Sequence, residues 1–307
     1  MRSISGNVAA WVAILYLASP AAAWDGTGHR IIAAIAYEHL PPGTRARVDA
    51  LIRAHPDYAA FTTGAPADAA GRARAAFIAA AVWADNIKGD RRFYDEAKSD
   101  AQPTPTLPGY PDMKRHANWH YYDKPYTPDG ARPVKKDQPS ALTELPRLLK
   151  EIGHVPPELA AYDLPWIVHI TGDLGQPLHC VSRMLKAMPA GDDGGNLVFV
   201  APGRNLHSLW DDTPGRDMSD AYVTKYATET MAEYPAPSKN ETNPKKWIEQ
   251  GYKQAITQVY TFGLETGSRE HPIPLPESYL ENAKRVGRAQ IAIAGYRLAQ
   301  VLNDRLK

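Results

Sequence analysis

The chain has 307 residues, 35 of them Lys or Arg and 34 of them Asp or Glu, which gives a formal net charge of +1 at pH 7. This near-neutral balance excludes a generally basic surface of the kind that binds duplex DNA, so any affinity for phosphate must be local. Cys180 is the only cysteine, which excludes an internal disulfide, and we expect it to be a small buried hydrophobe rather than a metal ligand.

Residues 1–23 are predicted to be a signal peptide. Arg2 is their only charge, an apolar run from Val8 to Leu17 follows it, and small residues lead up to Ala23. The apolar run is too short to span a bilayer, although an N-terminal membrane anchor is an alternative interpretation. Cleavage after Ala23 would leave 34 basic and 34 acidic side chains. We expect the product to be periplasmic or secreted, without stable membrane association.

The residue that follows the predicted cleavage site is Trp24, and His29 lies shortly after it. Cleavage would free the α-amine of Trp24. An α-amine titrates at about pH 8 and can bind zinc through its lone pair. We therefore expect removal of the signal peptide to create a metal ligand close to an imidazole.

The remainder, residues 24–307, is predicted to be one mostly α-helical domain. Small and apolar residues recur there every three or four positions, which is the period of an amphipathic helix. The predicted helices cover residues 28–39, 69–88, 140–152, 157–175, 216–232, 244–262 and 280–301. Prolines and polar residues predict loops at 101–112, 124–139 and 234–244, and the best strand signal is at 196–200.

A histidine and an aspartate four residues apart indicate a first metal site. His169 and Asp173 lie on one predicted helix, where side chains at this spacing share a face with Cβ atoms roughly 5–6 Å apart. Pro177 is expected to end that helix near Gln176. His179 lies beyond the expected turn, so we predict that it serves a different ion.

The same spacing recurs at His207 and Asp211. Together with His179 these residues would form a His-His-Asp set that leaves a position open for substrate, the pattern of a catalytic zinc site. One such pair is weak evidence, because hydrogen bonds on helix surfaces often produce it. Two pairs and an additional histidine favour metal binding.

Two further candidate ligands come from separate segments. Asp85 lies beside Trp83 near the end of an alanine-rich helix and needs a partner if it is buried; a surface ion pair with Lys88 is the alternative. His120 is flanked by aromatic residues and is either a ligand or a satisfied core histidine. The histidines assigned to no metal are His39, His55, His116, His154 and His271.

Six motifs follow one another along the chain: Trp24 with Gly28-His29, Trp83-Ala-Asp85-x-x-Lys88, Trp119-His120-Tyr121-Tyr122-Asp123, His169-x-x-x-Asp173-x-x-x-Pro177-Leu-His179, Gly194-Gly-Asn196, and Asn205-Leu-His207-x-x-Trp210-Asp211. Together they resemble the S1/P1 nuclease family of trinuclear zinc single-strand nucleases and 3′-nucleotidases, distantly related to bacterial zinc phospholipase C. The resemblance extends to Ala294–Asn303 near the C-terminus. It implies an all-α fold of the phospholipase C/P1 nuclease type with a small β-hairpin.

The resemblance also implies three zinc ions. The first would be held by Asp85, His120, His169 and Asp173. The second would be held by the amine and carbonyl of Trp24, by His29, and by Asp173 as a bridge. The third would be held by His179, His207 and Asp211.

The implied activity is hydrolysis of single-stranded DNA and RNA to 5′-mononucleotides by a monomeric endonuclease, with 3′-nucleotidase activity on nucleotides. Asp85 would orient the attacking hydroxide, and Lys88 and Asn196 would contact phosphate. Tyr121 would stack on a nucleobase and Asp123 would hydrogen-bond the base edge, which requires unpaired bases. The alternative is that Tyr121 belongs to the core and Asp123 caps a loop.

Three features depart from the family pattern. Asp212 replaces the usual threonine or serine after the last ligand and adds negative charge there. The loop at 98–113 is long and proline-rich, which leaves substrate access open. The disulfides of fungal and plant members are absent, which fits a bacterial origin.

Two rival functions share the metal ligands. A zinc phospholipase C would have the same metal core, but Tyr121, Asp123 and Gly194-Gly-Asn196 favour nucleic acid. An exported zinc-binding or scavenging protein would take up metal without turnover. That reading leaves Lys88 and Asn196 unexplained.

Overall fold

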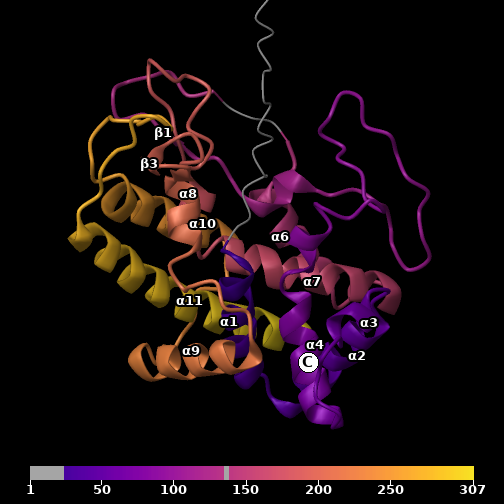
Figure 1. Cartoon of the computed structure of the whole chain (residues 1–307). Helices are drawn as coiled ribbons and strands as arrows, with labels where there is room; N and C mark the ends of the chain where they lie inside the picture. Colours follow the sequence, from indigo (N-terminus) through magenta and orange to yellow (C-terminus); the bar gives the residue numbers. More distant parts are fainter. Residues whose placement is uncertain (1–23, 135–137) are drawn as a thin grey trace, which may run out of the picture.

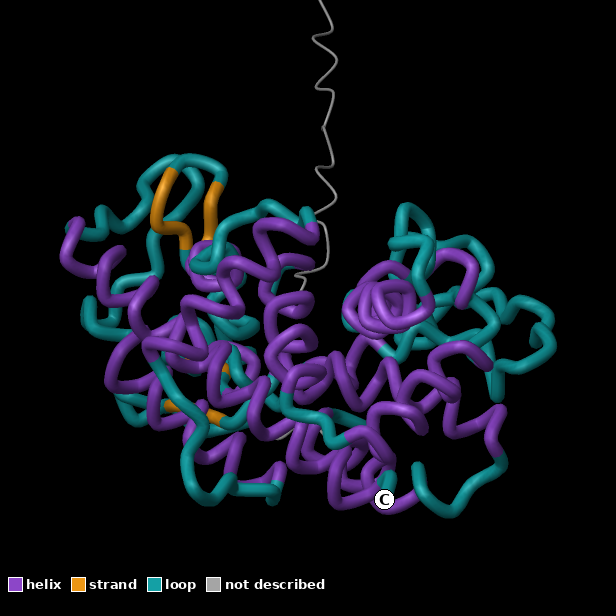
Figure 2. Tube along the Cα trace, turned by 90° about the horizontal axis from the view of Figure 1, so that it is seen from below, coloured by secondary structure: helices purple, strands orange, loops and turns teal. Residues whose placement is uncertain are grey.

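The computed structural model describes residues 24–134 and 138–307, and helices dominate these residues (Figure 1, Figure 2). The predicted signal peptide, including Val8–Leu17 and the cleavage site at Ala23, lies outside the described residues, as do residues 135–137 of a predicted loop. The all-α fold that the sequence predicts is confirmed. None of the helices in the described part of the chain has the length and hydropathy that a bilayer span requires.

The helices and strands have the following bounds. The α-helices are α1 (Gly26–Glu38), α2 (Pro42–Ala54), α3 (Tyr58–Phe61), α4 (Ala69–Ala80), α5 (Trp83–Asn86), α6 (Ala141–Glu151), α7 (Pro157–Asp173), α8 (Leu206–Asp211), α9 (Asp220–Glu233), α10 (Pro244–Gln254) and α11 (Glu277–Arg305). Two 3-10 turns, η1 (Ala117–His120) and η2 (Pro177–Cys180), and a π-helical turn, η3 (Ala255–Val259), join them. Strand β1 (Pro125–Tyr126) pairs in parallel with β2 (Ser182–Arg183), and β3 (Phe199–Ala201) forms a small antiparallel hairpin with β4 (Arg204–Asn205).

Helix α1 lies in the interior, in contact with α4, α7, α9 and α11 (Figure 1). The carboxylate of Asp25 caps its N-terminus by accepting hydrogen bonds from the backbone N–H groups of Thr27 and Gly28, both at 3.1 Å. The segment Ile31–Tyr37 is buried on every face of the helix. A helix that is apolar all round needs partners all round, and its neighbours provide them.

The prediction of one continuous helix over 69–88 is wrong, because the helix is interrupted between α4 and α5. Ala81 and Val82 separate the two helices. The carbonyl oxygen of Ala81 accepts a hydrogen bond from Nδ1 of His169 at 2.7 Å. The break therefore gives a backbone acceptor to a candidate metal ligand, and no local periodicity reports such a long-range contact.

Helix α7 ends earlier than the sequence predicts. Its last residue is Asp173, and Pro177 opens the separate turn η2. Gln176 has extended backbone dihedrals, which is the conformation that a following proline favours. The prediction that His179 lies beyond a turn is confirmed, but the helix ends near Asp173 rather than near Gln176.

Other boundaries differ in smaller ways. The predicted helix at 244–262 becomes α10 followed by the π-helical turn η3, and the strand predicted at 196–200 starts only at Phe199. Helix α2 was not predicted, although Pro42 at its first position and the buried spacing of Thr44, Val48 and Ile52 are signals for it. The remaining predicted helices begin and end within four residues of the observed ones.

The core consists of two apolar clusters. The larger cluster includes buried side chains of α1, α4, α7 and the second half of α11. The smaller one includes side chains of η2, α8, η3, the β3–β4 hairpin and the first part of α11. Cys180 is fully buried in the larger cluster, and burial raises the pKa of its thiol to about 12, as expected for a small hydrophobe.

Candidate metal centre and substrate cleft

Five side chains from four segments form what we call the inner cluster. Its members are His29 of α1, Asp85 of α5, His120 of η1, and His169 and Asp173 of α7. Four of them are buried and Asp85 is nearly so. Within it, two sets of three have all their ligand atoms within 4.8 Å of one another, His29–His169–Asp173 and Asp85–His120–His169. The structure thus brings together the predicted pair His169 and Asp173 with Asp85 and His120, the two candidate ligands from separate segments.

The carboxylate of Asp173 lies between two of the imidazoles. Oδ1 is 3.2 Å from Nε2 of His29, and Oδ2 is 3.2 Å from Nδ1 of His120. Both oxygens are buried, and neither accepts a hydrogen bond from the residues that the structure describes. Burial raises the pKa of Asp173 to about 8 and lowers that of His29 to about 4. The surrounding protein groups alone therefore stabilise neither the Asp173 carboxylate nor the protonated His29. A cation on each side of the carboxylate would satisfy this arrangement.

His179, His207 and Asp211 form what we call the outer cluster. Nδ1 of His179 donates to the carbonyl oxygen of His120 at 2.9 Å, and Nδ1 of His207 donates to that of Gly194 at 2.7 Å. Burial lowers the pKa of both imidazoles, that of His207 to about 4, so both Nε2 atoms are unprotonated.

The two unprotonated Nε2 atoms of the outer cluster face each other at 3.1 Å. Two lone pairs at this distance repel, whereas two imidazole nitrogens on one tetrahedral zinc ion stand about 3.3 Å apart. Oδ2 of Asp211 is 3.5 Å from Nε2 of His207 and supplies a third donor of the right type. The donor set and its spacing therefore fit a divalent transition metal.

Gln176 is a site residue that sequence reasoning missed. Its side chain is fully buried, its Nε2 donates to Oδ1 of Asp211 at 2.7 Å, and its Oε1 accepts from the backbone N–H of Leu178 at 2.6 Å. An outer partner of this kind holds a ligand in one orientation. Its position directly before Pro177, between Asp173 and His179, is the signal that could have found it.

Two glycines make room for the ligands. A Cβ on Gly172 would lie 2.7 Å from Nδ1 of His29, whose ring stacks on that of His169 at a centroid distance of 3.9 Å. Gly194 has φ of 60°, and a Cβ there would lie 2.6 Å from the carbonyl oxygen of Leu178. Larger residues would displace the imidazoles at these positions.

The ion pair that the sequence left as an alternative for Asp85 exists, but it belongs to the site. Nζ of Lys88 donates to Oδ1 of Asp85 at 2.6 Å, and the same oxygen is 3.7 Å from Nδ1 of His120. The two side chains are only 11% and 15% exposed, so this is no surface pair. Burial would raise the pKa of Asp85, but the charge of Lys88 and the neighbouring His169 hold it well below its usual value.

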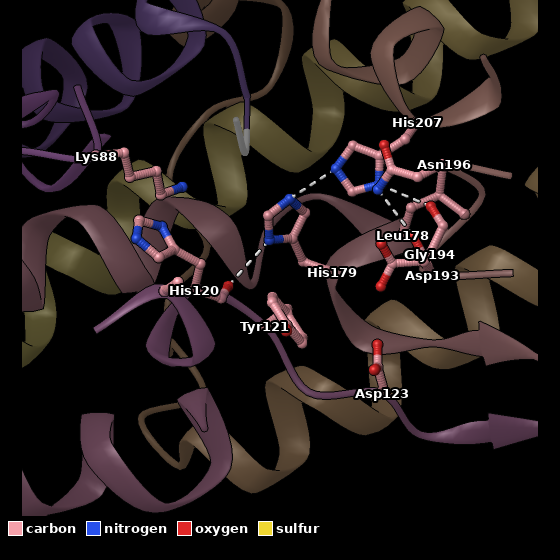
Figure 3. Close-up of a pocket in the computed structure, with 11 residues that line it drawn as sticks. Lys88, His120, Tyr121, Asp123, Leu178, His179, Asp193, Gly194, Asn196 and His207 are labelled. Carbon is pink, nitrogen blue, oxygen red and sulfur yellow. Dashed lines mark hydrogen bonds between the residues drawn. The ribbon is translucent and has the colours of Figure 1, made fainter. Parts of the chain in front are cut away.

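A cleft of about 170 Å³ opens over both clusters (Figure 3). Its lining residues are Lys88, Ala117, His120, Tyr121, Asp123, Leu178, His179, Asp193, Gly194, Asn196 and His207. In Figure 3, Lys88 and His120 lie at one end and Asn196 and His207 at the other, with Tyr121 between them. The predicted phosphate and base contacts therefore share one cavity with the candidate metal ligands.

The side chains predicted to contact substrate are partly exposed in this cleft. Tyr121 is half-buried, belongs to neither apolar cluster, and donates its hydroxyl to Oδ1 of Asn118 at 3.0 Å. The alternative interpretation places Tyr121 in the core. In the structure the neighbouring residue Tyr122, not Tyr121, packs against the larger cluster. Nδ2 of Asn196 donates to the backbone carbonyl of Asp193 at 2.8 Å, which holds the amide at the rim.

Trp24 begins the described chain beside the site. Its side chain is fully buried, and a Cβ on Gly28 would lie 2.7 Å from the Cβ of Trp24, so the two backbones approach closely. The backbone N–H of Asp25 donates to the backbone carbonyl of Asp211 at 3.4 Å. The N-terminal segment thus runs next to the outer cluster and enters α1, which carries His29.

The departures from the family pattern lie around this site. Asp212 directly follows α8 and pairs with the guanidinium groups of Arg204, at 3.0 Å, and Arg216. These two cations offset the additional negative charge beside Asp211. None of the residues that line the cleft comes from the proline-rich loop at 98–113.

Comparison with known proteins agrees with this geometry. A family model described as S1/P1 Nuclease matches residues 24–307, so the match begins at the residue after the predicted cleavage site. The chain is 23% identical over 316 residues to a protein named Nuclease S1 from Aspergillus oryzae, which covers 95% of this chain and 94% of that protein.

Proposed function

Because the chain belongs to the S1/P1 nuclease family, a family of metal-dependent hydrolases of phosphodiester bonds, we propose that it is a zinc endonuclease for single-stranded DNA and RNA. The resemblance that the sequence motifs indicate is confirmed by the match over residues 24–307. We propose that these residues form one catalytic domain that acts as a monomer. Its products would be 5′-mononucleotides, and it would also remove the 3′-phosphate of nucleotides.

The observation that carries this proposal is the pair of Nε2 nitrogens on His179 and His207, 3.1 Å apart at the wall of the cleft. We propose two zinc ions in the inner cluster, bridged by Asp173, and one in the outer cluster. Bound zinc would supply an activated water at neutral pH and neutralise charge on the phosphate.

Asp85 of the inner cluster and Lys88, which lines the cleft, would position the attacking water and the phosphate. Asp85 is an anion at neutral pH because of its low pKa, and its carboxylate would accept a hydrogen bond from that water. The ammonium group of Lys88, held by Asp85, would face a non-bridging phosphate oxygen. The amide of Asn196, at the opposite end, would donate to another. Donors fixed before the reaction stabilise the pentacovalent state without reorganisation.

Tyr121 and Asp123 would recognise the base. The ring of Tyr121 lies in the cleft between the two clusters (Figure 3), where an unpaired base could stack on it. Asp123 lines the same cavity and would accept from the base edge. Stacking on an aromatic ring is possible for any unpaired base but not for a base within a duplex. A protein of nearly neutral charge can therefore prefer single strands without a basic groove.

We propose that the free amine and the carbonyl of Trp24, with His29, complete the second zinc site after export to the periplasm or medium. The proximity of Asp25 to Asp211 supports this, since it places the N-terminal segment beside the clusters. A protein that retains residues 1–23, or one residue before Trp24, should bind at least one zinc fewer than the processed protein. Full zinc content and activity in both forms would refute the amine ligand.

The function is tested on processed protein by elemental analysis and by hydrolysis of a fluorescent oligonucleotide, single-stranded or annealed. We expect about three zinc ions per molecule, cleavage of the single strand, and loss of activity with chelator that added zinc restores. A matched assay on phosphatidylcholine addresses the lipase alternative. Cleavage of the lipid but not of the oligonucleotide, or zinc uptake without turnover of either, would overturn the proposal.

A further inference from the structure

A second cavity lies on the other side of η1 from the substrate cleft. Its volume is about 550 Å³, and the proline-rich loop that does not reach the cleft contributes Pro111 and Asp112 to its wall. The stacked rings of Trp119 and His116 line it, and Trp119 contacts the ring of Trp166, which in turn contacts His120. The lining includes none of the candidate metal ligands. This cavity is therefore separate from the candidate metal centre.

Asp163 of α7 lines this cavity, and one of its carboxyl oxygens is unsatisfied. The residue is 2% exposed, and its Oδ2 is buried without a hydrogen-bond partner among the described residues. Burial raises the pKa of Asp163 to about 7, although the charge of Arg147 opposes that shift. A buried carboxylate without a partner destabilises the protein, and a bound cationic ligand would remove that cost.

The cations beside Asp163 are already paired. Nε2 of His116 is 3.1 Å from the carboxylate of Asp112, and its Nδ1 is 3.5 Å from that of Glu96. The guanidinium group of Arg147 pairs with Glu144 at 2.8 Å and with Glu151 at 2.7 Å. Among the described residues, the lining holds four carboxylates against Lys114, Arg147 and His116. With Asp163 ionised, one negative charge therefore remains among them even when His116 is protonated. The cavity thus repels anions such as nucleotides and favours a cation.

The shape and lining of the cavity select the kind of cation. Trp119, Tyr162, Leu159 and Pro111 provide apolar wall, and the volume falls in the range of small-molecule sites. Among the described residues, the sets of His, Cys, Asp and Glu with ligand atoms close enough to hold a metal do not include Asp163. We propose that this cavity binds a small organic amine, with its ammonium group on the carboxylate of Asp163 and its carbon skeleton against the aromatic wall.

Calorimetric titration of the zinc-loaded protein with benzylamine tests this proposal, with benzyl alcohol as the uncharged isostere. Asp163→Asn removes the charge and no hydrogen bond, so we expect folding and zinc content to be retained. Affinity for benzylamine should fall at least about tenfold, because a hydrogen bond to a charged group is lost. Glu281→Gln, which neutralises an exposed acid on α11, is the matched control and should bind like the wild type.

A second variant keeps Asp163 and blocks access. Ala97 is exposed and lines the cavity, so Ala97→Trp should also weaken benzylamine binding at least about tenfold. Oligonucleotide hydrolysis should be unchanged in both variants, which separates this site from the proposed nuclease function. Equal affinity for benzylamine in Asp163→Asn and wild type, equal affinity for benzyl alcohol, or unaltered binding in Ala97→Trp would each overturn the proposal.

Discussion

Oδ1 of Asp173 lies 3.2 Å from Nε2 of His29, which joins the end of α7 to the beginning of α1 inside the protein. The other oxygen of the same carboxylate faces His120 at an equal distance. Three segments that are far apart in the sequence therefore converge on one acidic side chain. Because this carboxylate accepts no hydrogen bond from the described residues, its charge requires a cation.

Asp173→Asn should remove at least one zinc ion per molecule and lower oligonucleotide hydrolysis by at least about 100-fold. The amide keeps the shape of the side chain but has no charge and only one oxygen, so it cannot bridge two ions. Elemental analysis and initial rates on the same preparation measure both effects. Asp304→Asn, an exposed substitution on α11, is the control. Undiminished zinc in the Asp173 variant would contradict the bridging role.

Gln176→Ala should weaken zinc binding to the outer cluster roughly 10- to 100-fold, because Asp211 loses the donor that orients it. Competition with a chelator of known affinity measures the effect. Gln300→Ala, at the far end of α11, should leave the zinc affinity unchanged. If the two variants release zinc alike, Gln176 has only a structural role.

Gly194→Ala and Gly203→Ala form a matched pair. Both positions have positive φ, near 60° and 71°, but only a Cβ on Gly194 meets other atoms, at 2.6 Å from the carbonyl of Leu178. Gly203→Ala should cost about 1 kcal/mol of unfolding free energy. Gly194→Ala should cost more and also displace His207, with loss of zinc from the outer cluster. Denaturant unfolding and zinc content together test this, and equal behaviour of the pair would refute it.

Tyr121→Ala should raise KM for a single-stranded oligonucleotide about 5- to 150-fold, the range expected for loss of one base stack. Tyr121→Phe keeps the ring and should remain near the wild type, since the hydroxyl faces Asn118 rather than the cleft ligands. Steady-state kinetics on all three proteins decide the point. An unchanged KM in the alanine variant would leave the ring without a role in substrate binding.

His55 should contribute to acid sensitivity of the fold. Burial lowers its pKa to about 4, and Nδ1 accepts from the backbone N–H of Asp57 at 3.0 Å. The unfolded chain takes up a proton at about pH 6.5, so this stability is fully present above that pH and is lost as the pH falls toward 4. The loss amounts to about 3 kcal/mol.

The test is urea unfolding of wild type and His55→Asn between pH 7.5 and 4.5, with chelator present in both so that zinc release does not contribute. The variant should be less stable at pH 7.5, because the imidazole packs among Phe61, Trp83 and Tyr110. Its stability should also fall less with acid. Parallel pH profiles for the two proteins would show that His55 does not titrate on unfolding.

Local spacing made much of this protein predictable. The apolar period of three to four residues along α1 and α11 is a property of contiguous chain, since side chains at these positions share one face of a helix. The same geometry applies to His169 with Asp173 and to His207 with Asp211. Each pair could therefore be recognised as two candidate ligands of one site before any tertiary contact was known.

Tertiary packing decided what those pairs meet. The break at Ala81, the contact of Gln176 with Asp211 and the buried carboxyl of Asp163 all depend on segments that are distant in sequence. No periodicity encodes such distances, because they follow from how whole helices pack. Helix spacing could identify candidate ligands within a single segment, whereas the convergence of α1, η1 and α7 on one buried carboxylate exists only in the folded chain.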